Sequence, residues 1–134
     1  MVVRDRMSAY PVTIEPAASA LAALGLMQYH HLRHLPVVDG GAVVGILAER
    51  DLLLAASRHL HAGMEVAEVM SRNVVTVAPE TPLTEAARLM ATHSIGSLPV
   101  VDDTAQIVGI ITESDIFRAF ADLASEAREV GDAG

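Results

Sequence analysis

The chain has 134 residues, of which 51% are apolar and 3% aromatic, with no cysteine and a formal net charge of −8. This length and apolar content suit one compact unit whose core is built from small aliphatic side chains. The absence of cysteine excludes disulfides and thiolate metal sites. The acidic balance argues against a general nucleic-acid binder, which needs a basic face.

The beginning of the sequence carries Arg4, Asp5 and Arg6 and no apolar stretch of the signal-peptide kind. The longest apolar stretch, residues 17–27, is too short to span a bilayer. We therefore expect a cytoplasmic protein without a membrane segment.

The first half of the chain predicts alternating strands and helices. Val-rich runs indicate strands and the longer apolar-periodic stretches indicate helices. A Gly40-Gly41 pair marks a hairpin turn. In chain order the expected elements are a strand at 12–14, a helix at 19–30, strands at 35–39 and 43–47, and a helix at 49–57.

The second half predicts the same order of elements. Thr81 is the expected N-cap of its first helix, Pro82 the first helical residue, and Glu85 an acidic residue in the first turn. The helix is expected to stop near Gly96. The expected elements are a strand at 74–77, a helix at 82–93, strands at 98–102 and 107–111 joined by a turn at 103–105, and a helix at 113–123.

The two halves are copies of one unit. Leu35-Pro-Val-Val-Asp39 recurs 63 residues later as Leu98-Pro-Val-Val-Asp102, and 45–51 matches 109–115 at an offset of 64. We therefore predict an α/β (α+β) fold in which tandem β-α-β-β-α repeats pack with pseudo-twofold symmetry. The expected boundaries are 3–57 for the first repeat, 58–65 for a linker, 66–124 for the second repeat and 125–134 for a flexible acidic tail.

The sharpest local motif runs from Gly109 to Asp115, where a strand turns into a helix. Thr112 is a good N-cap, and Asp115 three residues later could complete a capping-box arrangement. The same groups could hold a nucleotide, because a carboxylate accepts hydrogen bonds from ribose hydroxyls and free helix N–H groups favour phosphate. The motif itself leaves both interpretations open.

The sequence resembles a pair of CBS (cystathionine beta-synthase) domains, also called a Bateman module, over about residues 3–123. The Leu-Pro-Val-Val-Asp motifs at 35–39 and 98–102 and the Gly-x-x-Thr-x-x-Asp pattern at 109–115 carry the resemblance. It implies a regulatory, energy-sensing module that needs no cofactor and catalyses nothing. Such a module would bind AMP, ADP or ATP in the cleft between the repeats, with S-adenosylmethionine ranked behind these, and would modulate a separate effector protein.

The resemblance also implies site residues. Thr112 and Asp115 are the expected ribose contacts of one site. Asp51 is the expected contact of the pseudo-symmetric site, where Ala48 replaces the Thr or Ser of the pattern and removes a hydroxyl contact, so we expect weaker binding there. The other expected ligand neighbours are Val12, Thr13, Val75, Thr76 and Ile110 around the adenine, and Arg33, His34, Gly96 and Ser97 around the phosphate.

Simpler structural roles compete with several of these assignments. Arg33 can offer a bidentate fork to phosphate, or can be a solvated side chain at a helix end. Gly96 is predicted to cap a helix, and the missing side chain would also leave room for a ligand.

The histidines suggest a metal site only weakly. His30, His31 and His34 are close in sequence and His59 and His61 alternate, but no carboxylate or cysteine completes a known spacing. We expect polar or pH-sensitive surface groups and no metal.

Catalysis finds little support in the sequence. No nucleophile elbow, P-loop or His-Glu-x-x-His motif is present. The carboxylate pairs Glu49 with Asp51 and Glu113 with Asp115 are already explained by the helix dipole.

Two helices are more apolar than one sheet face requires. They are the helix with Leu21, Leu24, Leu26 and Met27 and the final helix with Ile116, Phe117, Phe120 and Leu123. We expect a symmetric homodimer through these faces. The alternative is that they pack against each other within the chain.

Three functions therefore compete. The first is a nucleotide sensor. The second is a ligand-independent dimerisation or protein-interaction module in which the Thr/Asp pairs are only caps, and the third is a small enzyme or metal protein that uses the histidines.

Overall fold

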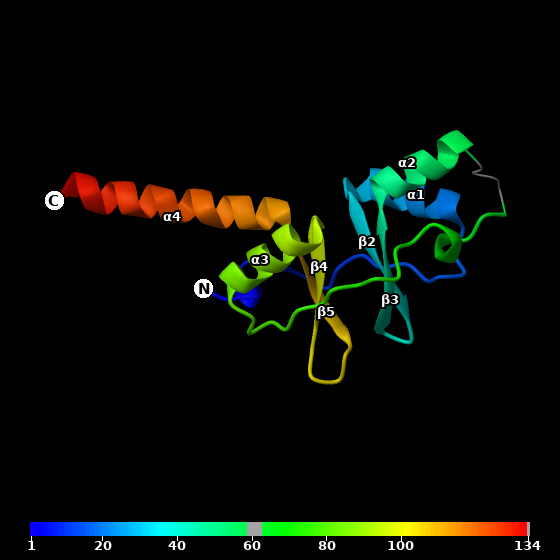
Figure 1. Cartoon of the computed structure of the whole chain (residues 1–134), viewed down its shortest axis with the longest axis horizontal. Helices are drawn as coiled ribbons and strands as arrows, with labels where there is room; N and C mark the ends of the chain where they lie inside the picture. Colours follow the sequence, from blue (N-terminus) through cyan, green and yellow to red (C-terminus); the bar gives the residue numbers. More distant parts are fainter. Residues whose placement is uncertain (59–62, 134) are drawn as a thin grey trace.

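The computed structural model describes residues 1–58 and 63–133, arranged as two side-by-side halves with a long final helix projecting from one of them (Figure 1). The β-α-β-β-α plan is confirmed in its helices and hairpins, and the fold is a mixed α/β pair of repeats. In chain order the elements are η1 (Val3–Asp5), β1 (Ser8–Ala9), α1 (Ala20–His30), β2 (His34–Asp39), β3 (Ala42–Ala48), α2 (Glu49–Arg58), η2 (Val66–Glu68), α3 (Leu83–His93), β4 (Ser97–Val101), β5 (Ile107–Thr112) and α4 (Glu113–Ala133).

Each repeat is built on one antiparallel hairpin. Strands β2 and β3 pair with Leu35 opposite Leu47, and β4 and β5 pair with Leu98 opposite Ile111. All four of these side chains are fully buried, because the period-2 pattern of each strand turns them toward the helices. The register shifts at equivalent places, between Val37 and Val38 and between Val100 and Val101.

The short strands expected at 12–14 and 74–77 are reduced to single parallel bridges, Ile14 with Val37 and Val77 with Val100. Flanking prolines limit how far these ladders can extend, because a proline has no N–H to donate. Pro11 and Pro16 flank the first segment, and Pro79 follows the second.

Strands β4 and β5 are joined by a third strand that comes from the other repeat, whereas β2 and β3 form a two-stranded sheet. Strand β1 pairs with β5, with Ser8 opposite Ile110. In the other half Ser71, the repeat equivalent of Ser8, bridges Ile46. The two copies therefore exchange their first segments.

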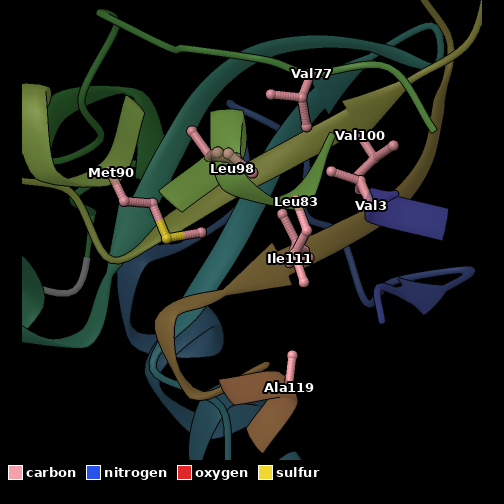
Figure 2. Packing of buried hydrophobic residues seen from close by; sticks show 9 residues of the cluster. Val3, Val77, Leu83, Met90, Leu98, Val100, Ile111 and Ala119 are labelled. Carbon is pink, nitrogen blue, oxygen red and sulfur yellow. The ribbon is translucent and has the colours of Figure 1, made fainter. Parts of the chain in front are cut away.

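The hydrophobic cores show the same exchange. Val3 of η1 is fully buried among second-repeat residues (Figure 2), and its N–H donates to the Thr81 carbonyl at 2.9 Å. Val66 of η2 is fully buried in the first-repeat core, and its N–H donates to the Ala18 carbonyl at 2.8 Å. The second core comprises Val3, Val77, Leu83, Ala86, Met90, Leu98, Val100, Ile111 and Ala119. The first comprises Ala20, Ala23, Met27, Leu35, Val37, Leu47, Leu52, Val66 and Met70.

The ends of the first helices differ slightly from expectation. Helix α3 begins at Leu83 with Pro82 at the N-cap position, because the Thr81 hydroxyl instead accepts from the Ala78 N–H at 3.0 Å. Helices α1 and α3 end in left-handed residues, His31 (φ 56°) and Ser94 (φ 53°). Ser94, and not Gly96, is therefore the C-cap of α3.

The hairpin turns meet near the pseudo-twofold axis. Gly40 and Gly41 adopt positive φ angles of 60° and 83°, which a tight two-residue turn between twisted strands requires. Ala42 bridges Gln106, and these two residues are repeat equivalents. A residue that contacts its own symmetry mate lies beside the axis, so the axis passes between the two hairpin tips.

The final helix is longer than expected. Helix α4 continues to Ala133, so most of the segment 125–134, for which the sequence predicts a flexible tail, has helical backbone. The run Ala-Asp-Leu-Ala-Ser-Glu-Ala-Arg at 121–128 contains mostly strong helix formers, which explains the extension. Within the described residues, no helix combines the length and apolar character needed to cross a bilayer.

Candidate ligand pockets between the repeats

Two pockets lie between the repeats, and residues of both repeats line each of them. The first, here called the Thr112 pocket, has a volume of about 520 Å³. The second, the Ala48 pocket, has a volume of about 720 Å³. The Thr112 pocket is lined by residues between 8 and 36 of the first repeat and between 96 and 118 of the second.

Most lining positions of the two pockets correspond through the internal repeat. Val12 in the Thr112 pocket corresponds to Val75 in the Ala48 pocket at the offset of 63, and Asp115 corresponds to Asp51 at the offset of 64. The pockets are therefore pseudo-symmetric versions of one site, and each substitution between them shows how the two have diverged.

Asp115 forms a hydrogen-bonded cluster with Thr112 and Arg118 at one wall of the Thr112 pocket. Its Oδ2 accepts from the Thr112 backbone N–H at 2.8 Å and from the Thr112 hydroxyl at 3.1 Å. Its Oδ1 accepts from an Arg118 guanidinium nitrogen at 2.6 Å. Asp115 is only 7% exposed, whereas the Arg118 side chain is 68% exposed. The carboxylate thus caps helix α4 and borders the pocket at once.

The equivalent wall of the Ala48 pocket lacks this cluster. Ala48 has no hydroxyl, and Leu54 stands where the second repeat has Arg118. Within the described residues no hydrogen bond joins Asp51 to Ala48. Asp51 is half-buried and lines its pocket together with Arg50.

Some of the residues expected to flank an adenine line the two pockets. Val12 and Ile110 line the Thr112 pocket, and Val75 lines the Ala48 pocket. Thr13 and Thr76 are not among the lining residues of either pocket. Successive side chains of an extended segment point to opposite sides, so only one of each Val-Thr pair can face the pocket. For these two threonines the position beside an adenine stays a prediction.

The residues expected near a phosphate lie where the pockets adjoin. Arg33 lines the Thr112 pocket, Ser97 lines the Ala48 pocket, and His34 and Gly96 line both. The Gly96 carbonyl accepts from the Glu113 N–H at 3.0 Å, and the Arg33 carbonyl accepts equivalently from the Glu49 N–H at 2.8 Å.

The missing side chain of Gly96 allows the Glu113 and His34 side chains to lie close to its backbone. A Cβ at this position would lie 3.3 Å from both Glu113 Oε1 and His34 Cε1. Burial lowers the pKa of His34, the Glu113 carboxylate partly opposes this, Arg33 lowers the pKa further and Asp51 raises it. His34 therefore favours its neutral form between the two pockets.

Sequence reasoning missed Arg118, Glu113 and Tyr10 as pocket residues. Arg118 had a readable signal, because a residue three positions after Asp115 on a helix lies on the same face. Tyr10 had none: it is 95% exposed at the rim of the Thr112 pocket with φ 51°, a conformation that only the folded backbone reveals.

Within the described part of the chain, no three metal-ligating side chains come close enough to hold a metal ion. His59 and His61, which the sequence singled out with the other histidines, lie outside the described residues.

Comparison with known proteins decides the family. The CBS domain model matches residues 3–58 and 66–122. The chain belongs to the CBS domain family. The CBS domain-containing protein YhcV of Bacillus subtilis is 36% identical over 115 residues, which cover 85% of this chain and 81% of YhcV.

Solved CBS domain pairs have the same architecture. The CBS domain pair of protein MJ0100, in complex with 5′-methylthioadenosine and S-adenosyl-L-methionine, has a TM-score of 0.85 and 34% identity over 91% of this chain and 97% of that one. CBSX2 in complex with AMP has a TM-score of 0.80 and 28% identity over 92% of this chain and 98% of that one.

Several curated relatives are enzymes of which this chain spans less than a quarter. L-aspartate semialdehyde sulfurtransferase of Methanocaldococcus jannaschii, for example, is 35% identical over 120 residues, which cover 89% of this chain and 23% of that protein.

Proposed function

We propose that this CBS domain pair is a non-catalytic regulatory module that binds an adenosine nucleotide, AMP, ADP or ATP, in the Thr112 pocket. The observation that carries the proposal is the placement of a buried carboxylate and a hydroxyl, Asp115 and Thr112, at the wall of a pocket lined by both repeats. The CBS pairs solved with AMP and with 5′-methylthioadenosine and S-adenosylmethionine support the adenosine class of ligand.

The wall has the chemistry that an adenosine compound needs. A carboxylate offers about four lone-pair sites, of which Thr112 and Arg118 use three, so Asp115 retains acceptor capacity toward a ribose hydroxyl. Val12 and Ile110 supply apolar surface for the faces of a base. Arg33 supplies a cationic fork for a phosphate.

A ligand in this pocket can alter the relative packing of the repeats because it contacts both. It shifts their equilibrium only by the difference in its affinity for the two arrangements. AMP and ATP competing for one pocket would let the module report the cellular energy state to a separate effector protein.

Isothermal titration calorimetry tests the proposal. AMP, ADP, ATP and S-adenosylmethionine are titrated into the wild-type chain, Asp115→Ala and Asp51→Ala. We expect nucleotide binding to the wild type, its loss in Asp115→Ala, and a smaller effect of Asp51→Ala because Ala48 lacks the side-chain hydroxyl that Thr112 supplies at the equivalent position. Failure of every ligand at millimolar concentration would refute the sensor.

We also propose that the chain forms a homodimer through its exposed apolar helix faces. Phe117 and Phe120 on α4 are 68% and 73% exposed, and the other large exposed apolar residues on the helices include Leu21 on α1, Leu53 and Leu54 on α2 and Leu123 on α4. Large apolar side chains exposed to water favour association, and twofold pairing is the commonest form.

Sedimentation analysis tests this assembly. Phe120→Glu should convert a dimer into a monomer, whereas Glu126→Gln, an exposed change further along α4, should not. A dimer that persists in Phe120→Glu would contradict the assignment of this face. A dimer combined with calorimetry showing no ligand binding would favour the ligand-independent interaction module.

A further inference from the structure

The internal repeat offers a built-in comparison of the two pockets. Basic side chains of the Thr112 pocket are replaced by neutral ones at the equivalent positions of the other half. His31 corresponds to Ser94, Arg33 to Gly96 and Arg118 to Leu54. Two changes go the other way: Ser114 corresponds to Arg50 in the Ala48 pocket, and Ala9 corresponds to Arg72, which is not among the residues that line that pocket.

These differences change the balance of formal charge. The Thr112 pocket has two arginines, Arg33 and Arg118, against the carboxylates Glu113 and Asp115. The Ala48 pocket has Arg50 alone against Glu113 and Asp51. His34 lines both pockets and therefore does not distinguish them.

Arg118 is placed to recognise an anion. Its bond to Asp115 Oδ1 fixes the guanidinium at the pocket wall, and one contact leaves most of its five N–H donors free. Because the Arg118 side chain is largely exposed, these N–H donors face solvent and the pocket, where a ligand can accept hydrogen bonds from them. A phosphate there would form charge-assisted hydrogen bonds with Arg118 and Arg33.

From this divergence we propose that the two pockets sort adenosine ligands by charge. The Thr112 pocket selects ligands that carry a phosphate, with Arg118 and Arg33 as the specificity-determining residues. The Ala48 pocket takes adenosine compounds whose 5′ group is uncharged or positive, because its two carboxylates outnumber its arginine. This inference rests on the proposed adenosine-binding function and assigns a different ligand class to each pocket.

Nuclear magnetic resonance can read each pocket separately in the full chain. The backbone amides of Thr112 and Ala48 report occupancy of their own pockets, and the probes are AMP and neutral 5′-methylthioadenosine. We expect the ratio of AMP affinity to 5′-methylthioadenosine affinity to be higher at Thr112 than at Ala48. The difference should be roughly tenfold or more, the size expected for one or two charge-assisted hydrogen bonds.

Variants assign this selectivity to residues. Arg118→Gln should lower AMP affinity at the Thr112 amide roughly tenfold and leave 5′-methylthioadenosine affinity almost unchanged. Arg88→Gln, which removes the same charge from an exposed site outside both pockets, should change neither. Leu54→Arg should raise AMP affinity at the Ala48 amide.

The outcomes separate the two proposals. If neither probe perturbs either amide, adenosine binding itself fails. If both probes bind with equal affinity ratios at the two pockets, or if Arg118→Gln weakens both ligands equally, adenosine binding stands and charge sorting is wrong.

Discussion

Val3 and Val66 are 63 positions apart in the sequence and occupy equivalent places, each fully buried in the core of the opposite repeat. Their backbones are also equivalent, because each N–H donates to a carbonyl of the half that receives it. The two halves are thus held together by reciprocal short segments as well as by the contact between the hairpins.

Truncating either valine should destabilise the whole molecule. Val3→Ala and Val66→Ala each remove two buried methyl groups, for which we expect a loss of about 2 kcal/mol in the free energy of unfolding. Urea denaturation at matched protein concentration measures it. Val2→Ala, at a half-buried neighbour, serves as the milder control. An effect below that of the control would contradict the packing role of η1.

Two equivalent glycines should resist substitution. A Cβ on Gly109 would lie 2.6 Å from Met7 Sδ and 3.0 Å from the Ser8 carbonyl oxygen, and one on Gly45 would lie 2.5 Å from Met70 Sδ and 3.0 Å from the Ser71 carbonyl oxygen. Methionine can move, but the backbone carbonyl is held in the exchanged pairing. We expect Gly109→Ala and Gly45→Ala to cost about 1–3 kcal/mol of unfolding free energy.

Gly25 provides the opposite control for the glycine experiment. It lies within α1, and apart from the helix's own backbone and its two chain neighbours, no atom of the described residues stands within 4 Å of the place that a Cβ would occupy. Gly25→Ala should therefore stabilise the chain by about 0.5–1 kcal/mol, since alanine loses less entropy in a helix. Thermal denaturation that ranked all three variants alike would contradict these close contacts.

The two motif aspartates should differ in their contribution to stability. Asp115→Ala removes the acceptor of the Thr112 N–H at the start of α4, so we expect a loss of about 1–2 kcal/mol. Asp51→Ala removes no comparable hydrogen bond among the described residues and should change the unfolding free energy by less than about 0.5 kcal/mol. Chemical denaturation without ligand measures both. Equal losses would show that Asp51 caps α2 as Asp115 caps α4.

Stability should fall as the solution becomes mildly acidic. Because burial lowers the pKa of folded His34, the unfolded chain binds more protons than the folded one between that lowered value and about 6.5. The stability that neutral His34 contributes is complete above the pKa of the unfolded chain and is lost as the pH falls below it. Arg33 adds to the lowering of the folded pKa, whereas the Glu113 and Asp51 carboxylates oppose it.

Denaturation between pH 7.5 and 5.5 checks this dependence on His34. His34→Gln should flatten the decline, whereas His93→Gln, at an exposed helix end, should keep the wild-type slope. A decline of unchanged steepness in His34→Gln would assign the effect to other groups.

The sequence predicts what is local in this fold. The hairpins follow from short Val-rich runs around Gly40-Gly41 and from their copy 63 residues later, and the motif at Thr112 and Asp115 marks a true helix start. The exchange of η1 and η2 was not predictable, because Val3 shows in sequence only that it is apolar, and not which core receives it. The sequence places Arg118 on the same helix face as Asp115, but the pocket that both residues line is created only by the packing of the two repeats.

The reciprocal placement of Val3 and Val66 has a consequence for how such a protein could arise. A single repeat would lack the segment that completes its core and could obtain it only from a second molecule. Joining two copies in tandem turns that encounter into an intramolecular step, at the millimolar effective concentrations typical of short tethers. Gene duplication with fusion would therefore preserve an existing pairing and remove its dependence on protein concentration.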